Sequence, residues 1–148
     1  MRALIQRVKR GSVSIDGRLK GEIGSGYVLL LGVGREDGED DIAYLVRKTV
    51  NLRIFADGDG KINLSLRDTG GQMLIISQFT LYADTSRGNR PGFEPAAPPE
   101  QAARLYERFV AAMRAEGVPV QTGEFGADMT VEIINDGPVT IMLDSRAR

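Results

Sequence analysis

The feature that most constrains the fold is a pair of unbroken apolar runs of strand length. They span Tyr27–Val33 and Met73–Ile76, and neither alternates with polar residues as a strand with one wet face does. Strands without such alternation are typically buried on both faces. The sequence therefore predicts a sheet that is covered on both sides in this part of the chain.

Other periodicities predict two helices and several shorter strands. Apolar residues at helical spacing, with acidic residues first and basic residues last, predict a helix over about residues 39–50. A second helix is predicted over Pro99–Glu116, closed by Gly117. Asp16-Gly17 is typical of a two-residue hairpin. The remaining strands are expected at Ala3–Val8, Ser12–Ile15, Arg18–Ile23, Leu52–Phe55, Met73–Leu81, Val118–Gln121, Thr130–Ile134 and Val139–Leu143.

Length and element order indicate one α/β domain over residues 1–148. A chain of 148 residues has the usual length of a single domain. The irregular stretch Asp84–Pro99 does not divide it, because neither side alone supplies a convincing core. Two helices and about eight strands predict a layered structure.

Composition removes most familiar catalytic chemistries. The chain contains no His and no Cys, so it has no imidazole base, thiolate nucleophile or His/Cys metal site. An enzyme of this composition must use hydroxyls, amides, carboxylates, Lys, Arg or groups of its substrate. No apolar run approaches the roughly 20 residues of a membrane helix. We therefore expect a cytoplasmic protein with no membrane partner, no metal and no cofactor.

Net charge limits how the chain can meet nucleic acid. The formal charge of −1 excludes a chain-wide basic field, although a local basic patch stays compatible with it. Arg87-Gly88-Asn89-Arg90-Pro91-Gly92-Phe93 combines two guanidiniums with an aromatic ring in the longest irregular stretch. Such a set can hold phosphates and stack a base. The same residues equally fit a solvated surface loop.

Polar residues end the second apolar run at Ser77-Gln78-Phe79-Thr80. Hydroxyl and amide groups need partners when buried, so their concentration at a strand end fits a cleft lined by these side chains and by backbone N–H groups as well as it fits a plain strand terminus. Thr80 is a poor nucleophile in either case, because no His is present to deprotonate it.

Gly137-Pro138 is the second unusual segment, between two late strands. Proline is tolerated at the start of a strand, and a Gly-Pro bond can be cis or trans. A cis bond would turn the neighbouring carbonyl groups in an unusual direction and could make a recognition surface from main chain alone.

Together, Ser77-Gln78-Phe79-Thr80-Leu81 and Asn135-Asp136-Gly137-Pro138-Val139-Thr140 resemble the two signature motifs of the D-aminoacyl-tRNA deacylase family. The resemblance covers nearly the whole chain. It includes Met1–Val8, Arg53–Phe55, the loop from Arg87 to Phe93, and Thr122–Met129.

This resemblance implies an α/β fold with two β-sheets and two main helices on one outer face. It also implies a homodimer with active sites at the subunit interface, where a cis Gly137-Pro138 enters the neighbouring site and its carbonyl oxygens exclude L-amino acids. Gln78, Phe79 and Thr80 would be the catalytic residues and Ser77 would line the pocket. Arg7 would hold the Gly-Pro turn and Phe125 would contact the terminal adenosine of the tRNA 3′ end.

The implied reaction is hydrolysis of the ester in D-aminoacyl-tRNA, a step of translation quality control. Glycine has no side chain to exclude, so glycyl-tRNA is an expected substrate too. A ribose 2′-OH beside the ester can replace the missing protein base. The alternatives are a non-catalytic RNA-binding module around the Arg87–Phe93 loop, a metal-dependent hydrolase using scattered carboxylates, and a purely structural dimer.

Overall fold

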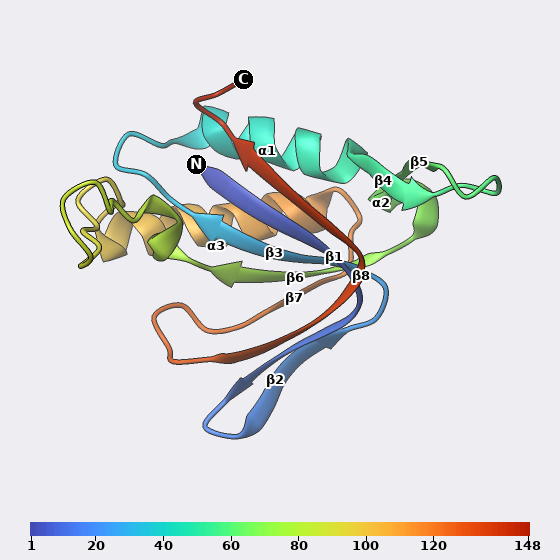
Figure 1. Cartoon of the computed structure of the whole chain (residues 1–148), viewed down its shortest axis with the longest axis horizontal. Coiled ribbons are helices and arrows are strands. Elements are labelled where there is room, and N and C mark those ends of the chain that lie inside the picture. Colours follow the sequence, from blue (N-terminus) through green and yellow to red (C-terminus); the bar gives the residue numbers. More distant parts are fainter.

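The computed structural model describes all residues from Met1 to Arg148, and Figure 1 shows its elements. In chain order these are β1 (Arg2–Ile15), β2 (Arg18–Ile23), β3 (Gly26–Gly32), α1 (Glu39–Asn51), β4 (Arg53–Ala56), β5 (Ile62–Ser65), α2 (Leu66–Thr69), β6 (Gln72–Ser77), the 3-10 helix η1 (Phe79–Tyr82), α3 (Pro99–Ala115), β7 (Val120–Thr122) and β8 (Thr130–Asp144). None of the helices is long and apolar enough to span a membrane.

The long strand β1 organises a six-stranded sheet. Its first half pairs with β3 and its second half with β2, both antiparallel, while β8 runs along its other edge. β3 pairs with β6, and β6 with β7, in parallel. β4 and β5 form a separate two-stranded sheet. Gly11 lies in the second half of β1, where a Cβ would lie 2.6 Å from the side chain of Val28.

Both faces of β3 and β6 are buried, as the unbroken apolar runs predict. Alternate residues such as Leu29 and Ile75 join a core of 25 buried residues beneath α1 and α3. Their neighbours, such as Val28 and Leu74, join a second cluster of six on the other face. The end of β1, β2 and the start of β8 curl over that second cluster. The predicted α/β class is confirmed, with both long helices on one outer face (Figure 1).

Several boundaries differ from the predictions. The expected strands Ala3–Val8 and Ser12–Ile15 are one strand, and so are Thr130–Ile134 and Val139–Leu143. The expected strand to Leu81 ends at Ser77, because β3 offers no partner beyond the pair Leu31–Ser77. β5 and α2 were not expected, and α2 begins with a capping box between Ser65 and Asp68.

A buried ionic cluster joins the two ends of the chain to the start of α1. The terminal ammonium of Met1 lies 2.6 Å from the carboxylate of Asp37, and both groups are almost fully buried. The same ammonium donates to the hydroxyl of Ser145 at 2.7 Å. Arg146 lies 3.4 Å from both Asp37 and Asp41. These contacts fasten β1 and the end of β8 to the helical layer.

This cluster makes stability sensitive to acid. Burial alone raises the pKa of Asp41, but hydrogen bonds from Ser145 and Gly38 and the nearby terminal ammonium and Arg146 together hold that pKa below its ordinary value of 3.8. A carboxyl group with a lowered folded-state pKa stabilises the fold above its unfolded pKa and loses that contribution as pH falls through the folded pKa. We expect the urea midpoint to be constant from pH 7 to about pH 5 and to fall below about pH 4. Asp41→Asn should flatten this decline, and a midpoint equal at pH 7 and pH 3 would contradict the expectation.

Candidate active site

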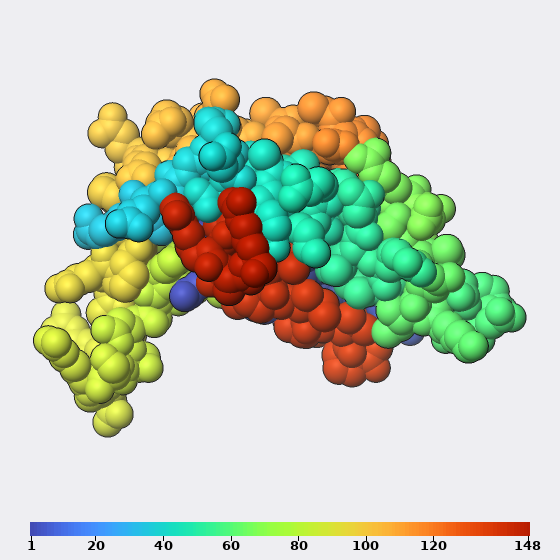
Figure 2. All heavy atoms as spheres, turned by 90° about the horizontal axis from the view of Figure 1, so that it is seen from above, coloured from blue at the N-terminus to red at the C-terminus, as the bar shows by residue number.

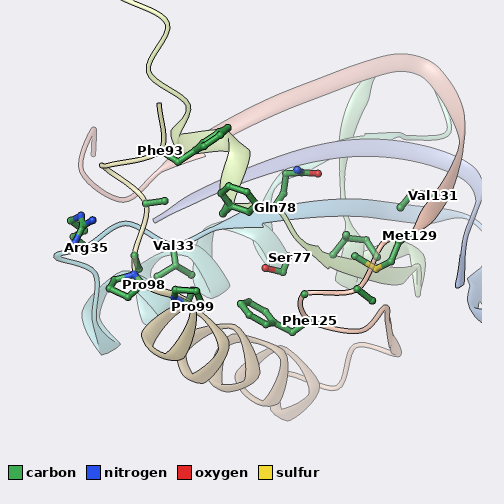
Figure 3. A pocket seen from close by; sticks show the side chains of 17 residues that line it. Val33, Arg35, Ser77, Gln78, Phe93, Pro98, Pro99, Phe125, Met129 and Val131 are labelled. Carbon is green, nitrogen blue, oxygen red and sulfur yellow. The ribbon is translucent and has the colours of Figure 1, made fainter. Parts of the chain in front are cut away.

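A cavity of about 730 Å³ opens at the carboxyl ends of the parallel strands β3 and β6. This edge is where ligands of α/β sheets usually bind. Figure 3 shows the side chains around it. Eleven of the 17 lining residues are hydrophobic. The full set is Val33, Arg35, Ile76, Ser77, Gln78, Phe79, Phe93, Ala96, Ala97, Pro98, Pro99, Ala102, Phe125, Gly126, Ala127, Met129 and Val131.

The polar end of β6 supplies this cavity with hydrogen-bonding groups. Ser77, Gln78 and Phe79 all line it. The N–H of Gln78 still donates to Leu31 at 2.8 Å, after which the chain turns into η1. The side-chain amide of Gln78 donates to the hydroxyl of Thr80, which is exposed and does not line the cavity itself. Three of the four expected residues in Ser77–Thr80 therefore line the cavity, and the fourth, Thr80, is hydrogen-bonded to Gln78.

Backbone donors are available at the same point. Phe79 and Thr80 are the first two residues of η1, so their N–H groups have no partner inside that helix. A carbonyl oxygen that gains negative charge next to such donors is stabilised. The arrangement is therefore suited to an acyl-transfer or ester-hydrolysis reaction.

Aromatic rings border the cavity on two sides. Phe79 and Phe93 meet edge to face with ring centres 4.9 Å apart. Phe125 lies 6.1 Å from the ring of Tyr106, whose hydroxyl donates to the carbonyl of Ile75 at 2.8 Å. Burial raises the pKa of Tyr106 to about 12, so this hydroxyl stays protonated as a structural donor.

The Gly137–Pro138 bond is cis and lies in a bulge of β8. Gln6 of β1 pairs with Thr140 and Val8 pairs with Asn135, so four residues of β8 face the single residue Arg7. The guanidinium of Arg7 donates to the carbonyl of Asp136 at 3.0 Å and to that of Ile54 at 2.5 Å. The expected proximity of Arg7 to the Gly-Pro turn is thus present.

This bulge lies far from the cavity of its own chain. Arg7 is level with Tyr27 and Met73, whereas Ser77 ends β6 four residues further on. That offset is about 13 Å along the strands, and β8 lies three strand spacings from β6, about 14 Å across. Gly137 and Pro138 are exposed. The structure therefore brings together the residues expected around Ser77 but leaves the Gly-Pro turn apart from them.

Several cavity residues were not anticipated. Val33, Ala97 and Met129 are apolar residues that look like core in the sequence. Arg35 was missed as well, although it follows the Gly32-x-Gly34 turn at the end of a buried strand, where cavities form. No group of three or more acidic residues is placed to hold a metal ion.

Comparison with known proteins gives consistent matches over nearly the whole chain. Residues 4–144 match the family model described as D-Tyr-tRNA(Tyr) deacylase. A D-aminoacyl-tRNA deacylase from Chlorobaculum tepidum is 58% identical over 146 residues, which are 98% of this chain and 97% of that protein.

Solved structures resemble this one closely. A structure named c-Myc DNA Unwinding Element Binding Protein superposes with a TM-score of 0.93 at 43% identity, covering 97% of this chain and 98% of that one. A structure described as "a probable eukaryotic D-amino acid tRNA deacylase" superposes with a TM-score of 0.80 at 21% identity, covering 96% and 97%. The second likeness shows the shared fold.

Proposed function

Because the chain belongs to the D-Tyr-tRNA(Tyr) deacylase family, we propose that it hydrolyses the ester that joins a D-amino acid to the 3′-terminal ribose of tRNA. The family resemblance inferred from the two motifs is confirmed by these matches. The observation that carries the proposal is the polar end of β6, where Ser77, Gln78 and Phe79 enter an otherwise apolar cavity beside free backbone donors. A deacylase of this substrate acts where translation occurs, in the cytoplasm.

The proposed chemistry uses the protein for binding and charge stabilisation. A water molecule attacks the ester carbonyl, and the N–H groups of Phe79 and Thr80 donate to the oxygen that becomes negative. Donors of this kind contribute about 2.7–4 kcal/mol each in other enzymes. The ester bond to the ribose O3′ then breaks, and that oxygen takes up the proton that the attacking water loses. The ribose 2′-OH activates or positions the water, since no His is present to act as the base.

In this mechanism Thr80 contributes through position. Its hydroxyl accepts a hydrogen bond from Gln78 and so orders the start of η1. Thr80→Ala should slow single-turnover deacylation by at most about a hundredfold, the effect of a small misplacement. Thr80→Ser keeps the hydroxyl and should retain most of the rate. A loss near the roughly 10⁶-fold that follows removal of a covalent nucleophile would overturn this role.

The Gly137-Pro138 turn is proposed to act on a neighbouring subunit. It is exposed and lies far from the cavity of its own chain, which supports a homodimer whose active sites lie at the interface. There its carbonyl oxygens would occupy the space of an L side chain, while a D side chain points to solvent. Such a site rejects one hand without reading the side chain, so many D-amino acids and glycine should be accepted.

Two further residues have proposed binding roles. Arg7 holds the bulge that carries Gly137 through its hydrogen bond to Asp136. Phe125 lines the cavity and offers a ring face to the terminal adenosine. Both roles are positional, because the guanidinium of Arg7 is engaged by the carbonyls of Asp136 and Ile54 and the ring of Phe125 carries no acid or base.

Hydrolysis of matched D- and L-tyrosyl-tRNA by the purified chain tests the proposal. We expect release of D-tyrosine with the L-ester left intact. Equal cleavage of both would overturn the stereochemical part of the proposal. Binding of tRNA without hydrolysis of either would instead identify a non-catalytic RNA-binding module, and loss of activity in chelator would point to a metal-dependent hydrolase.

A further inference from the structure

The loop Thr85–Pro91 is the one distinctive motif that the ester chemistry leaves unused. It projects from the body of the molecule as a separate lobe, yellow-green in Figure 2. Every residue in it is exposed. Its only charged side chains are Arg87 and Arg90, and neither forms an ion pair or a side-chain hydrogen bond within the chain. This loop therefore presents two unpaired guanidiniums to solvent.

The base of the loop is fixed to the cavity. Asp84 and Gly92 exchange two backbone hydrogen bonds of 2.8 and 2.9 Å, which close the loop. The next residue, Phe93, packs against Phe79 and lines the cavity together with it. Arg35, which lines the same cavity, donates to the carbonyl of Glu94. The chain that leaves the base of the loop is therefore part of the cavity wall through Phe93.

We propose that Arg87 and Arg90 bind phosphates of the tRNA strand that leads out of the active site. This inference rests on the proposed function. With the esterified ribose in the cavity, the remaining nucleotides must leave it, and the loop is joined to the cavity through Phe93, one of its lining residues. Guanidinium groups bind phosphate oxygens in pairs, without reading the bases. The chain as a whole carries a charge of −1, so a local basic loop is the feature that can attract RNA to this edge.

The charges around the loop are compatible with this role. The two acidic residues at its base are Asp84 and Glu94. The carboxylate of Asp84 accepts a hydrogen bond from the N–H of Ser86, which keeps it at the base of the loop. The start of α1 lies at the same end of the molecule (Figure 1), and two of its three acidic residues have cations of their own, since Glu39 pairs with Arg108 and Asp41 with Arg146.

The test compares a long and a short substrate. In a variant with Arg87→Gln and Arg90→Gln, the enzyme concentration for half-maximal single-turnover cleavage of D-tyrosyl-tRNA should rise about tenfold. When the logarithm of this half-maximal enzyme concentration is plotted against the logarithm of salt concentration, the slope should be smaller by about 1.4–1.8 in the variant. That is the value for two lost phosphate contacts. Cleavage of 2′(3′)-O-D-tyrosyl-adenosine, which lacks those phosphates, should be unchanged.

Two control variants separate this role from general charge and from folding. Arg18→Gln with Lys20→Gln also removes two exposed cations, but on β2, and should leave both substrates unaffected. Arg87→Lys with Arg90→Lys keeps the charge and should retain most of the affinity for tRNA. Thermal unfolding of each variant should match that of the unmodified chain.

Each other outcome overturns the inference. Unchanged tRNA cleavage in the Arg87/Arg90 variant would make the segment a solvated loop. Equal weakening on both substrates would mean that the loop shapes the cavity, and equal weakening by the β2 control would mean that net charge alone matters. If the unmodified chain cleaves neither substrate, the proposed function itself fails. The loop is then tested by binding of uncharged tRNA, which the Arg87→Gln/Arg90→Gln variant should weaken and the Arg18→Gln/Lys20→Gln variant should not.

Discussion

Asp37→Asn is expected to lower the free energy of unfolding by about 3 kcal/mol, because it leaves the terminal ammonium of Met1 buried without its counter-ion. Removing one partner of a buried ion pair costs about 3–5 kcal/mol in other proteins. The lower end applies here because Asp41 also faces this ammonium. The carboxylate of Asp37 also accepts a hydrogen bond from the N–H of Gly34 at 2.6 Å, so its loss also loosens the turn that enters α1.

Urea unfolding of this variant beside Asp40→Asn isolates the buried charge. Asp40 lies three residues away, is exposed and forms no ion pair through its side chain. Its substitution should change the unfolding midpoint far less than that of Asp37. Comparable midpoints for the two variants would show that the ammonium finds another partner and that the cluster does not hold the chain ends.

The predicted elements that proved right are those whose signal is local. The run Tyr27–Val33, the hairpin at Asp16-Gly17 and the helix ending before Gly117 all follow from short-range patterns. The cluster around Asp37 could not be found in this way, because it joins Met1 to Ser145 across 144 residues.

Strand boundaries failed where pairing decides them. The segment Asn135–Pro138 contains strong turn residues, yet β8 continues through it because Arg7 holds the bulge and β1 supplies partners on both sides. The end of β6 is set by the last residue of β3 that can pair with it, which no local pattern in Met73–Leu81 reveals.

Residue patterns alone predicted only the polar part of the site, and the family resemblance added Phe79 and Phe125, which also line the cavity. Ser77 and Gln78 stand out because they interrupt an apolar strand, and they line the cavity as expected. The apolar walls come from segments distant in sequence and have the composition of ordinary core. Most of the cavity therefore becomes visible only once the carboxyl ends of β3 and β6 are placed beside the start of α3.

Gly137→Ala is expected to reduce the ratio of D- to L-tyrosyl-tRNA cleavage by about a hundredfold, the effect of a displacement near 1 Å in an active site. Gly137 has φ +128°, a conformation that L residues rarely adopt. An added Cβ would lie 3.0 Å from the guanidinium of Arg7 and 3.0 Å from the backbone nitrogen of Val139. The backbone must therefore shift, and the carbonyl groups proposed to exclude L side chains shift with it.

A matched substitution controls for backbone strain alone. Gly60 also has a positive φ of +74°, but nothing lies within 4 Å of an added Cβ. Gly60→Ala should therefore cause similar local strain in the β4–β5 turn without altering the D/L ratio. An unchanged ratio in Gly137→Ala would remove the proposed role of this turn, provided that the variant unfolds at the same temperature as the Gly60 control.

In the proposed homodimer, mixed dimers decide which pocket the turn serves. A chain slowed at its own pocket by Gln78→Ala still carries an intact Gly137. If the turn acts across the interface, an excess of that chain pairs each Gly137→Ala subunit with a partner that has the unmodified turn. Cleavage of L-tyrosyl-tRNA by the Gly137→Ala pocket should then be suppressed. If the turn acts within its own chain, the same excess leaves L-tyrosyl-tRNA cleavage per Gly137→Ala chain unchanged. The separation of about 13 Å along and 14 Å across the strands between the turn and its own cavity argues for the first result.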